Sequence, residues 1–145
     1  MSRWGGGVSI ITTLDGQGGP CGFTASSFSS VSLDPPMVLF CLGLESSVTE
    51  TFLKANAFAA HILSSKQQAL SNQFAASGAD RFEGLEIRSG YEGIPILAGS
   101  LAVLECRIVH RYPGGDHIIV VGEVEAVQVG EGNPLLYFKG QYATL

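Results

Sequence analysis

Charged side chains are scarce in this sequence of 145 residues: they make up 14% of it, and thirteen acidic against eight basic residues give a net charge of −5. No cluster of Lys and Arg occurs, so we expect no nucleic-acid partner, because neutralising phosphates requires concentrated positive charge. The longest nearly unbroken apolar run, Pro35 to Leu44, is far shorter than the roughly 20 residues that span a bilayer, and no membrane segment is predicted. With 46% apolar residues, the composition is that of a single compact domain over 1–145.

Cysteine is also rare, and its distribution excludes two common kinds of small domain. Cys21, Cys41 and Cys106 are odd in number and widely spaced, without a C-x-x-C pair. This pattern predicts neither a disulfide framework nor a zinc site, and we expect reduced thiols and no metal. The start of the chain, Met1 to Gly5, has no charged segment followed by an apolar one as in a secretory signal, so we expect a cytoplasmic protein.

Glycine and proline are abundant, with nineteen and six residues, which is typical of short strands and turns and not of a helical bundle. Runs rich in β-branched or apolar residues predict strands within 8–14, 21–32, 37–44 and 58–63, and alternation predicts two long strands on either side of Tyr112 to Asp116. Capping-box patterns at Ser47-x-x-Glu50 and Ser65-x-x-Gln68 predict two short helices. We therefore expect a mainly β protein with short helices, built as a closed or partly closed antiparallel barrel.

Nucleotide-binding loops of the common kinds are lacking. Gly16 to Cys21 comes close to G-x-G-x-x-G, but Cys21 occupies the third glycine position and no helical pattern follows. No G-x-x-x-x-G-K-[ST] is present. We interpret Gly16 to Cys21 as a hairpin turn.

Hydroxyl side chains gather in two places. Five of the seven residues from Thr24 to Ser30 carry a hydroxyl group; such a strand can bond the polar edge of a flat ligand, or it can simply face solvent. Ser46, Ser47 and Thr49 lie where the first helix is predicted to begin. Amides and the dipole at a helix start favour a phosphate, and plain helix capping is the alternative.

The three histidines have different settings. His117 follows Gly114, Gly115 and Asp116 at a strand entrance, where it can donate a hydrogen bond or act as an acid near neutral pH, or serve a structural role. His61 lies within an apolar strand, and we expect it to be packed with a backbone partner. We expect His110 on the outer face of its strand.

Several segments together resemble the flavin reductase family, whose fold is the FMN-binding split barrel. The resemblance begins at Gly22 with GFTASSFSSVSLDPPMVLFCL and continues with NAFAAHILSSKQQALSNQFA from Asn56, DRFEG from Asp80, LAVLEC from Leu101, GDH from Gly115 and LLYFKGQY from Leu135. It implies an antiparallel Greek-key split barrel, a homodimer, and reduction of FMN or FAD by NADH or NADPH. It also implies that reduced flavin is supplied to a separate monooxygenase.

The resemblance also implies a set of site residues. Those that would line the isoalloxazine, ribityl chain and phosphate, or cover the flavin from the side, are Thr24, Ala25, Ser26, Ser27, Cys41, Leu42, Gly43, Ser46, Ser47, Thr49, Asn72, Gln73, Phe74, Arg81 and Phe82. The nicotinamide would meet Gly115, Asp116, His117 and Tyr142. In this reading His117 is the catalytic residue, which positions the carboxamide or polarises the flavin.

One departure from the family pattern and two other functions remain open. The segment Glu45 to Val48 lacks the basic residue often found near the flavin phosphate, so the choice between FMN and FAD stays open. One alternative is an FMN-dependent oxidase of the pyridoxamine phosphate oxidase type. The other is a non-catalytic flavin-binding electron carrier.

Overall fold

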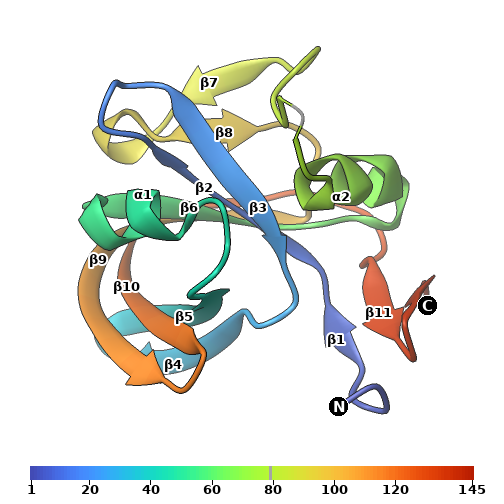
Figure 1. The fold of residues 1–145 in the computed structure, drawn as a ribbon. Coiled ribbons are helices and arrows are strands. Elements are labelled where there is room, and N and C mark those ends of the chain that lie inside the picture. Colours follow the sequence, from blue (N-terminus) through green and yellow to red (C-terminus); the bar gives the residue numbers. More distant parts are fainter. Residues whose placement is uncertain (79) are drawn as a thin grey trace.

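The computed structural model describes residues 1–78 and 80–145 and is mostly antiparallel β structure (Figure 1). The strands are β1 (Gly6–Gly7), β2 (Ser9–Leu14), β3 (Pro20–Ala25), β4 (Ser29–Leu33), β5 (Pro36–Gly43), β6 (Ala57–Ile62), β7 (Ile87–Ser89), β8 (Pro95–Leu97), β9 (Ala102–Gly114), β10 (His117–Val129), β11 (Leu136–Phe138) and β12 (Gln141–Ala143). The helices are α1 (Thr49–Lys54) and α2 (Gln68–Ala75), with single 3₁₀ turns η1 (Ser65–Gln67) and η2 (Tyr91–Gly93).

The main sheet has seven antiparallel strands in the order β3-β2-β6-β9-β10-β5-β4. Neighbours such as β2 and β6, or β10 and β5, are far apart in sequence, as in a Greek-key arrangement. Figure 1 shows β9 and β10 bending strongly, so that the sheet curls. Its two end strands, β3 and β4, are not hydrogen-bonded to each other within the described residues. The sheet is therefore an open barrel, which confirms the predicted split-barrel fold class.

Side chains from both ends of this sheet meet in one core. Alternation along β5 sends Val38, Phe40 and Leu42 inward. The Phe40 ring makes edge contacts with Phe52 of α1 and Phe58 of β6, at centroid distances of 5.5 and 4.9 Å. These contacts hold α1 inside the curl of the sheet, and burying such rings is a main source of stability.

The two predicted helices exist, but their capping boxes do not form where the sequence pattern places them. The helix α1 begins at Thr49 without a side-chain cap, and the Thr49 hydroxyl instead donates to Gly43 O at 2.6 Å. The second box lies one residue earlier than predicted, with Ser64 and Gln67 as its reciprocal pair. The first predicted box was wrong because it does not form, and the second was wrong in register by one residue. Tertiary contacts, and not the local pattern alone, determine which side chains cap these short helices.

The helix α2 packs close to β3 through Gly22. A Cβ atom on Gly22 would lie 2.9 Å from Ile11 O and 3.1 Å from the Phe74 ring, so no larger residue fits there without displacement. Phe74 belongs to a second hydrophobic cluster under α2, together with Ile10, Leu63 and others. The small sheet β1-β11-β12 lies beside this helix (Figure 1).

Sequence patterns missed the short strands. No strand was predicted between Asp80 and Ser100, yet β7 and β8 pair there, and Ile96 of β8 belongs to a third cluster with Ile94 and Val103. Strands of two or three residues carry too little alternation to be recognised. No helix in the described part of the chain is long and apolar enough to cross a membrane.

Candidate flavin and nicotinamide site

The hydroxyl-rich segment at the end of β3 is tied to two neighbouring elements. The Thr24 hydroxyl donates to Ser71 O of α2 at 2.7 Å. The Ser27 hydroxyl exchanges hydrogen bonds with the backbone of Cys41, accepting from its N–H at 2.8 Å and donating to its carbonyl at 3.2 Å. Ser26 is exposed between them, so its hydroxyl is the one of the three that is open to a ligand.

The end of β5 adjoins the start of β10. Gly43 is paired with His117 across the two strands, and Leu44 N–H donates to Asp116 O at 2.9 Å. A Cβ on Gly43 would lie 3.8 Å from His117 Nε2, in van der Waals contact with it, so a glycine here leaves Nε2 less covered. This pairing brings Gly115, Asp116 and His117 next to the predicted ribityl strand, but it does not bring Tyr142, which is bonded to α2.

The half-exposed His117 ring is oriented by its neighbour. His117 Nδ1 lies 2.7 Å from Asp116 Oδ1, and this hydrogen bond lowers the pKa of the Asp116 carboxyl. With Nδ1 engaged by a carboxylate, Nε2 is the ring nitrogen left for a ligand. Gly115 beside them has a positive φ of 71°, which favours glycine in this turn.

The predicted phosphate turn is compact. Ser46 N–H donates to Gly43 O, and the Ser46 hydroxyl accepts from Val48 N–H at 3.4 Å. The Thr49 side chain is buried and its hydroxyl is used by Gly43. Ser47 is exposed and remains the clearest hydroxyl donor for a ligand.

The helix α2 carries a small polar network that the sequence did not reveal. Ser71 is fully buried, and its hydroxyl lies 2.8 Å from the Tyr142 hydroxyl. Tyr142 in turn donates to Asn72 Oδ1 at 2.8 Å. Ser71 was not among the predicted residues because a single serine in a helix has no motif, and only the fold brings it to Tyr142.

Gln73, Arg81 and Phe82 form the edge next to α2. Gln73 donates to the backbone carbonyls of Arg81 and Glu83, and Arg81 donates to Gly22 O at 2.9 Å. The Phe82 ring makes an edge contact with Phe74 at 4.9 Å. A groove of about 270 Å³ opens between this edge and α1, and Ser47, Arg81 and Phe82 are among its lining residues.

The predicted residues are spread along β3 and beyond it. Arg81 is bonded to Gly22 in its first half, whereas Thr24 and Ser27, at and just after its end, are bonded to α2 and β5. The side chains of Ala25, Leu42 and Phe74 are buried in hydrophobic clusters, so a ligand could meet these residues only through their backbone. The exposed Ser26, Ser47 and Asn72 and the half-exposed His117 are the donors and acceptors open to a ligand. Small hydroxyls, an amide and a histidine suit the carbonyl edge and phosphate of a flavin.

The remaining histidines and thiols lie outside this set. His61 is fully buried, with Nδ1 bonded to Ile10 O and Nε2 accepting from Leu97 N–H, both at 3.0 Å. This confirms the expected packed histidine with a backbone partner. His110 is exposed as predicted and stacks on Tyr112. Burial raises the pKa of the Cys106 thiol to about 12, so this cysteine stays protonated.

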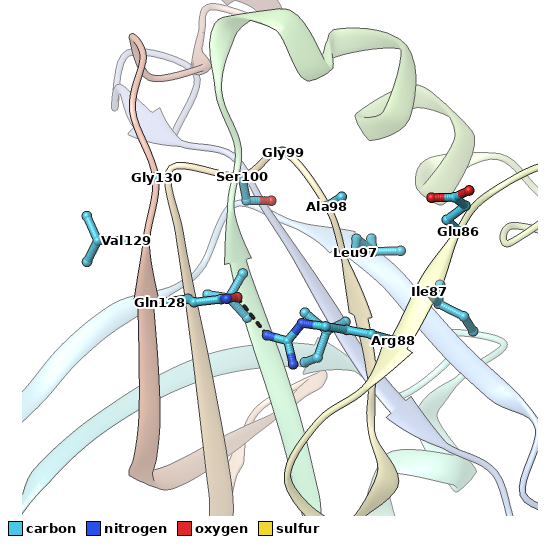
Figure 2. Close-up of a pocket in the computed structure, with 12 residues that line it drawn as sticks. Glu86, Ile87, Arg88, Leu97, Ala98, Gly99, Ser100, Gln128, Val129 and Gly130 are labelled. Atoms are coloured by element: carbon cyan, nitrogen blue, oxygen red, sulfur yellow. Dashed lines mark hydrogen bonds between the residues drawn. The ribbon is translucent and has the colours of Figure 1, made fainter.

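A larger pocket lies elsewhere and contains none of the predicted residues. Its volume is about 470 Å³, and it is lined by β7, β8 and the distant ends of β9 and β10 (Figure 2). Arg88 spans it and donates to Gln128 Oε1 at 2.6 Å. Since the guanidinium already has this partner and Glu86 and Glu105 lie nearby, the pocket offers no net positive charge to an anionic cofactor.

An open antiparallel barrel with Greek-key connections is the fold of flavin-binding split-barrel proteins. The family model described as "Flavin reductase like domain" matches residues 1–145. The chain belongs to this family, which confirms the resemblance found in the sequence.

Curated relatives agree with this assignment. The chain is 42% identical over 146 residues to an actinorhodin polyketide dimerase of Streptomyces coelicolor, covering 100% of this chain and 82% of that protein. It is 42% identical over 138 residues to a probable flavin reductase of Rhizobium meliloti, covering 95% of this chain and 44% of that longer protein. It is 38% identical over 137 residues to the reductase subunit of a flavin-dependent monooxygenase of Rhodococcus jostii, covering 94% and 70%.

A solved structure supports the same fold and family. It is an NADH:FAD oxidoreductase of Streptomyces globisporus, in complex with NAD and FAD fragments. The two chains share 35% sequence identity and a TM-score of 0.91, over 98% of this chain and 86% of the other.

Proposed function

We propose that this chain is an NAD(P)H:flavin oxidoreductase that transfers hydride from reduced nicotinamide to FMN or FAD. The observation that carries this proposal is the pairing of Gly43 with His117. His117 therefore lies at the end of β5, whose Cys41 is hydrogen-bonded to Ser27 of the hydroxyl-rich segment. Relatives named as flavin reductases and an NADH:FAD oxidoreductase support the enzyme class and both cofactors.

The flavin supplies the redox chemistry when it is bound, by accepting hydride at its N5 atom. The contribution of the chain is to bind and orient. Ser26 and the backbone of Thr24, Ala25 and Ser27 would meet the carbonyl edge of the isoalloxazine. Ser46 and Ser47 would contact the phosphate, and Asn72 and Arg81 would border the ring from the side of α2. The backbone of Cys41, Leu42 and Gly43 would follow the ribityl chain.

His117 would hold the nicotinamide over the flavin. Its Nε2 is the free ring nitrogen and is suited to bond the carboxamide, while Gly115 leaves room for a flat ring to approach. Orienting two bound reactants in this way is worth a large share of the barrier of a bimolecular reaction. Asp116 would fix the orientation of the His117 ring, and Tyr142 would border the same mouth.

The physiological setting is proposed from the relatives and the surface. A reductase subunit of a monooxygenase is among the relatives, so we expect reduced flavin to pass to a monooxygenase component. We also propose a cytoplasmic homodimer. Exposed apolar side chains on the edge strand β4 support a second copy next to the site.

The experiment that tests this function is the oxidation of NADH and of NADPH by the purified chain, with FMN, FAD, riboflavin or no flavin added. We expect turnover that depends on added flavin, and the comparison identifies the preferred flavin and nicotinamide. A flavin that binds tightly but is not reduced by either nicotinamide would contradict the proposal and favour the oxidase or electron-carrier function.

A further inference from the structure

Tyr142 lies on the last strand of the chain but is bonded to α2. Its ring packs against the hydrophobic cluster under that helix and makes an edge contact with Tyr137 at 5.4 Å. Its hydroxyl contacts Ser71 Oγ and Asn72 Oδ1, each at 2.8 Å. The hydroxyl is therefore engaged within the protein.

The number of hydrogens on the Tyr142 hydroxyl determines which group donates in each of its two hydrogen bonds. A tyrosine hydroxyl has one hydrogen, and that of Tyr142 is donated to Asn72 Oδ1. Ser71 must then donate to the Tyr142 oxygen. The Asn72 carboxamide is held by its oxygen, which leaves its Nδ2 donors on the exposed side of the helix; no other hydrogen bond of this carboxamide is found within the described residues.

The same network also connects α2 to β3. Ser71, which is fully buried, accepts at its carbonyl from the Thr24 hydroxyl at 2.7 Å and engages Tyr142 through its side chain. One residue of α2 thus connects the carboxyl-terminal strand to the hydroxyl-rich strand. Because this network is anchored on the fully buried Ser71, it restricts the side-chain arrangements of Tyr142 and Asn72.

We propose that Tyr142 is a positioning residue for the flavin, acting through Asn72. Its hydroxyl holds the Asn72 carboxamide so that the Nδ2–H donors face the bound isoalloxazine, and it makes no direct contact with the nicotinamide. This inference rests on the proposed function, because the role of Asn72 depends on flavin binding at this edge.

The test compares Tyr142→Phe with Asn72→Ala and the double variant. Flavin dissociation constants come from the quenching of flavin fluorescence, and KM and kcat come from NADH oxidation. For Tyr142→Phe we expect flavin binding about fivefold weaker, from the loss of one net hydrogen bond, with kcat and the KM for NADH within about twofold. The double variant should bind flavin as Asn72→Ala does, because both substitutions remove the same interaction.

The matched control is Tyr137→Phe on the same hairpin, whose hydroxyl has no hydrogen bond within the described residues; it should leave both constants unchanged. Ser71→Ala is a second variant that removes a Tyr142 partner without altering the tyrosine, and it should also weaken flavin binding. Three results would each overturn the proposal. The first is a double variant in which the two losses of flavin affinity multiply. The others are an unchanged flavin dissociation constant in Tyr142→Phe, and a Tyr142→Phe variant in which only the KM for NADH is raised. Failure of the proposed function is a separate result: the unaltered chain would then show no reduction of flavin by NADH or NADPH, whether or not it binds flavin.

Discussion

The buried residue His61 makes the stability of the fold depend on pH in the acid range. Its ring bridges β2 and β8 as the neutral form, with a hydrogen on Nδ1 and an accepting Nε2. Burial lowers its pKa from an ordinary value of 6.5 to about 4. A protonated His61 ring cannot accept the hydrogen bond from Leu97 N–H. Protonation of His61 therefore destabilises the folded state.

We expect the His61 contribution to stability to be complete above about pH 6.5 and to be lost as the pH falls toward 4. The unfolded chain binds a proton at His61 over this interval and the folded chain does not, so the free energy of unfolding rises with pH there. The shift corresponds to at most about 3 kcal/mol. Urea unfolding of the unaltered chain and of His61→Phe between pH 4.5 and 7.5 measures the effect.

His61→Phe should lower the free energy of unfolding by about 2 to 4 kcal/mol at pH 7.5, because two buried backbone groups lose their partner. It should also flatten the pH dependence. His110→Phe is the control, since His110 is an exposed histidine stacked on Tyr112. Equal pH slopes for the unaltered chain and His61→Phe would show that His61 is not the sensitive group.

At His117 the expected effect is on reduction and not on stability. For His117→Ala we expect the rate of flavin reduction by NADH to fall about 10- to 100-fold, the range for losing a hydrogen bond from an ionisable group. The flavin dissociation constant should change by less than about twofold. Stopped-flow reduction of bound flavin separates the two quantities, with His110→Ala as the control. An unchanged rate of reduction together with weaker flavin binding would indicate that His117 binds the flavin and not the nicotinamide.

Among the elements, α1 depends on contacts beyond its own sequence. Six residues are too few for an isolated helix, and α1 is held at its start by Thr49 and at its end by Arg111 of β9. Arg111 donates to Phe52 O at 2.9 and 3.2 Å and also to Ala55 O. A cation at these carbonyls satisfies the helix end and its dipole.

Replacing Arg111 by Lys should therefore loosen α1 and, with it, the proposed phosphate turn that precedes this helix. Lysine keeps the charge but loses the planar fork that reaches two carbonyls, and we expect the free energy of unfolding to fall by about 1 to 2 kcal/mol. Binding of FMN should weaken more than binding of riboflavin, which has no phosphate. Arg107→Lys on the same strand is the control, because its partners Glu123 and Glu125 form surface ion pairs. If FMN and riboflavin lost the same amount of binding affinity, α1 would have no role in binding the phosphate.

The elements also show what sequence could and could not predict. Alternation identified the β9–β10 pair, and apolar or β-branched runs identified β2, β5 and β6. The run 21–32, predicted as one strand, forms the two strands β3 and β4. The strands β1, β7, β8, β11 and β12 were missed because they are short and are stabilised by distant partners. At the site, family motifs indicated Asn72 and Tyr142 individually, but the Ser71 hydroxyl that joins them to β3 is visible only in the fold.

At the scale of the whole molecule, the open edge of the sheet is the main unsatisfied feature. The strand β4 pairs only with β5 among the described strands, and it carries Val31 and Leu33 with 46% and 95% of their surfaces exposed. Apolar edge strands invite pairing unless they are covered. Ser27, at the proposed flavin edge, adjoins β4, so a second copy seated there would also border the site.

We therefore expect a homodimer that buries β4, with a mass near twice the 15.2 kDa of one chain. Leu33→Lys should shift the protein toward monomers and weaken flavin binding, because a charge at the centre of an apolar contact is costly to desolvate. Light scattering coupled to size exclusion measures the mass.

The control is Val129→Lys, which alters a side chain that is 82% exposed at the distant end of β10. A dimer that survives Leu33→Lys and dissociates with Val129→Lys would move the interface to the ends of β9 and β10. A monomeric unaltered chain would show that the flavin edge is complete within one copy.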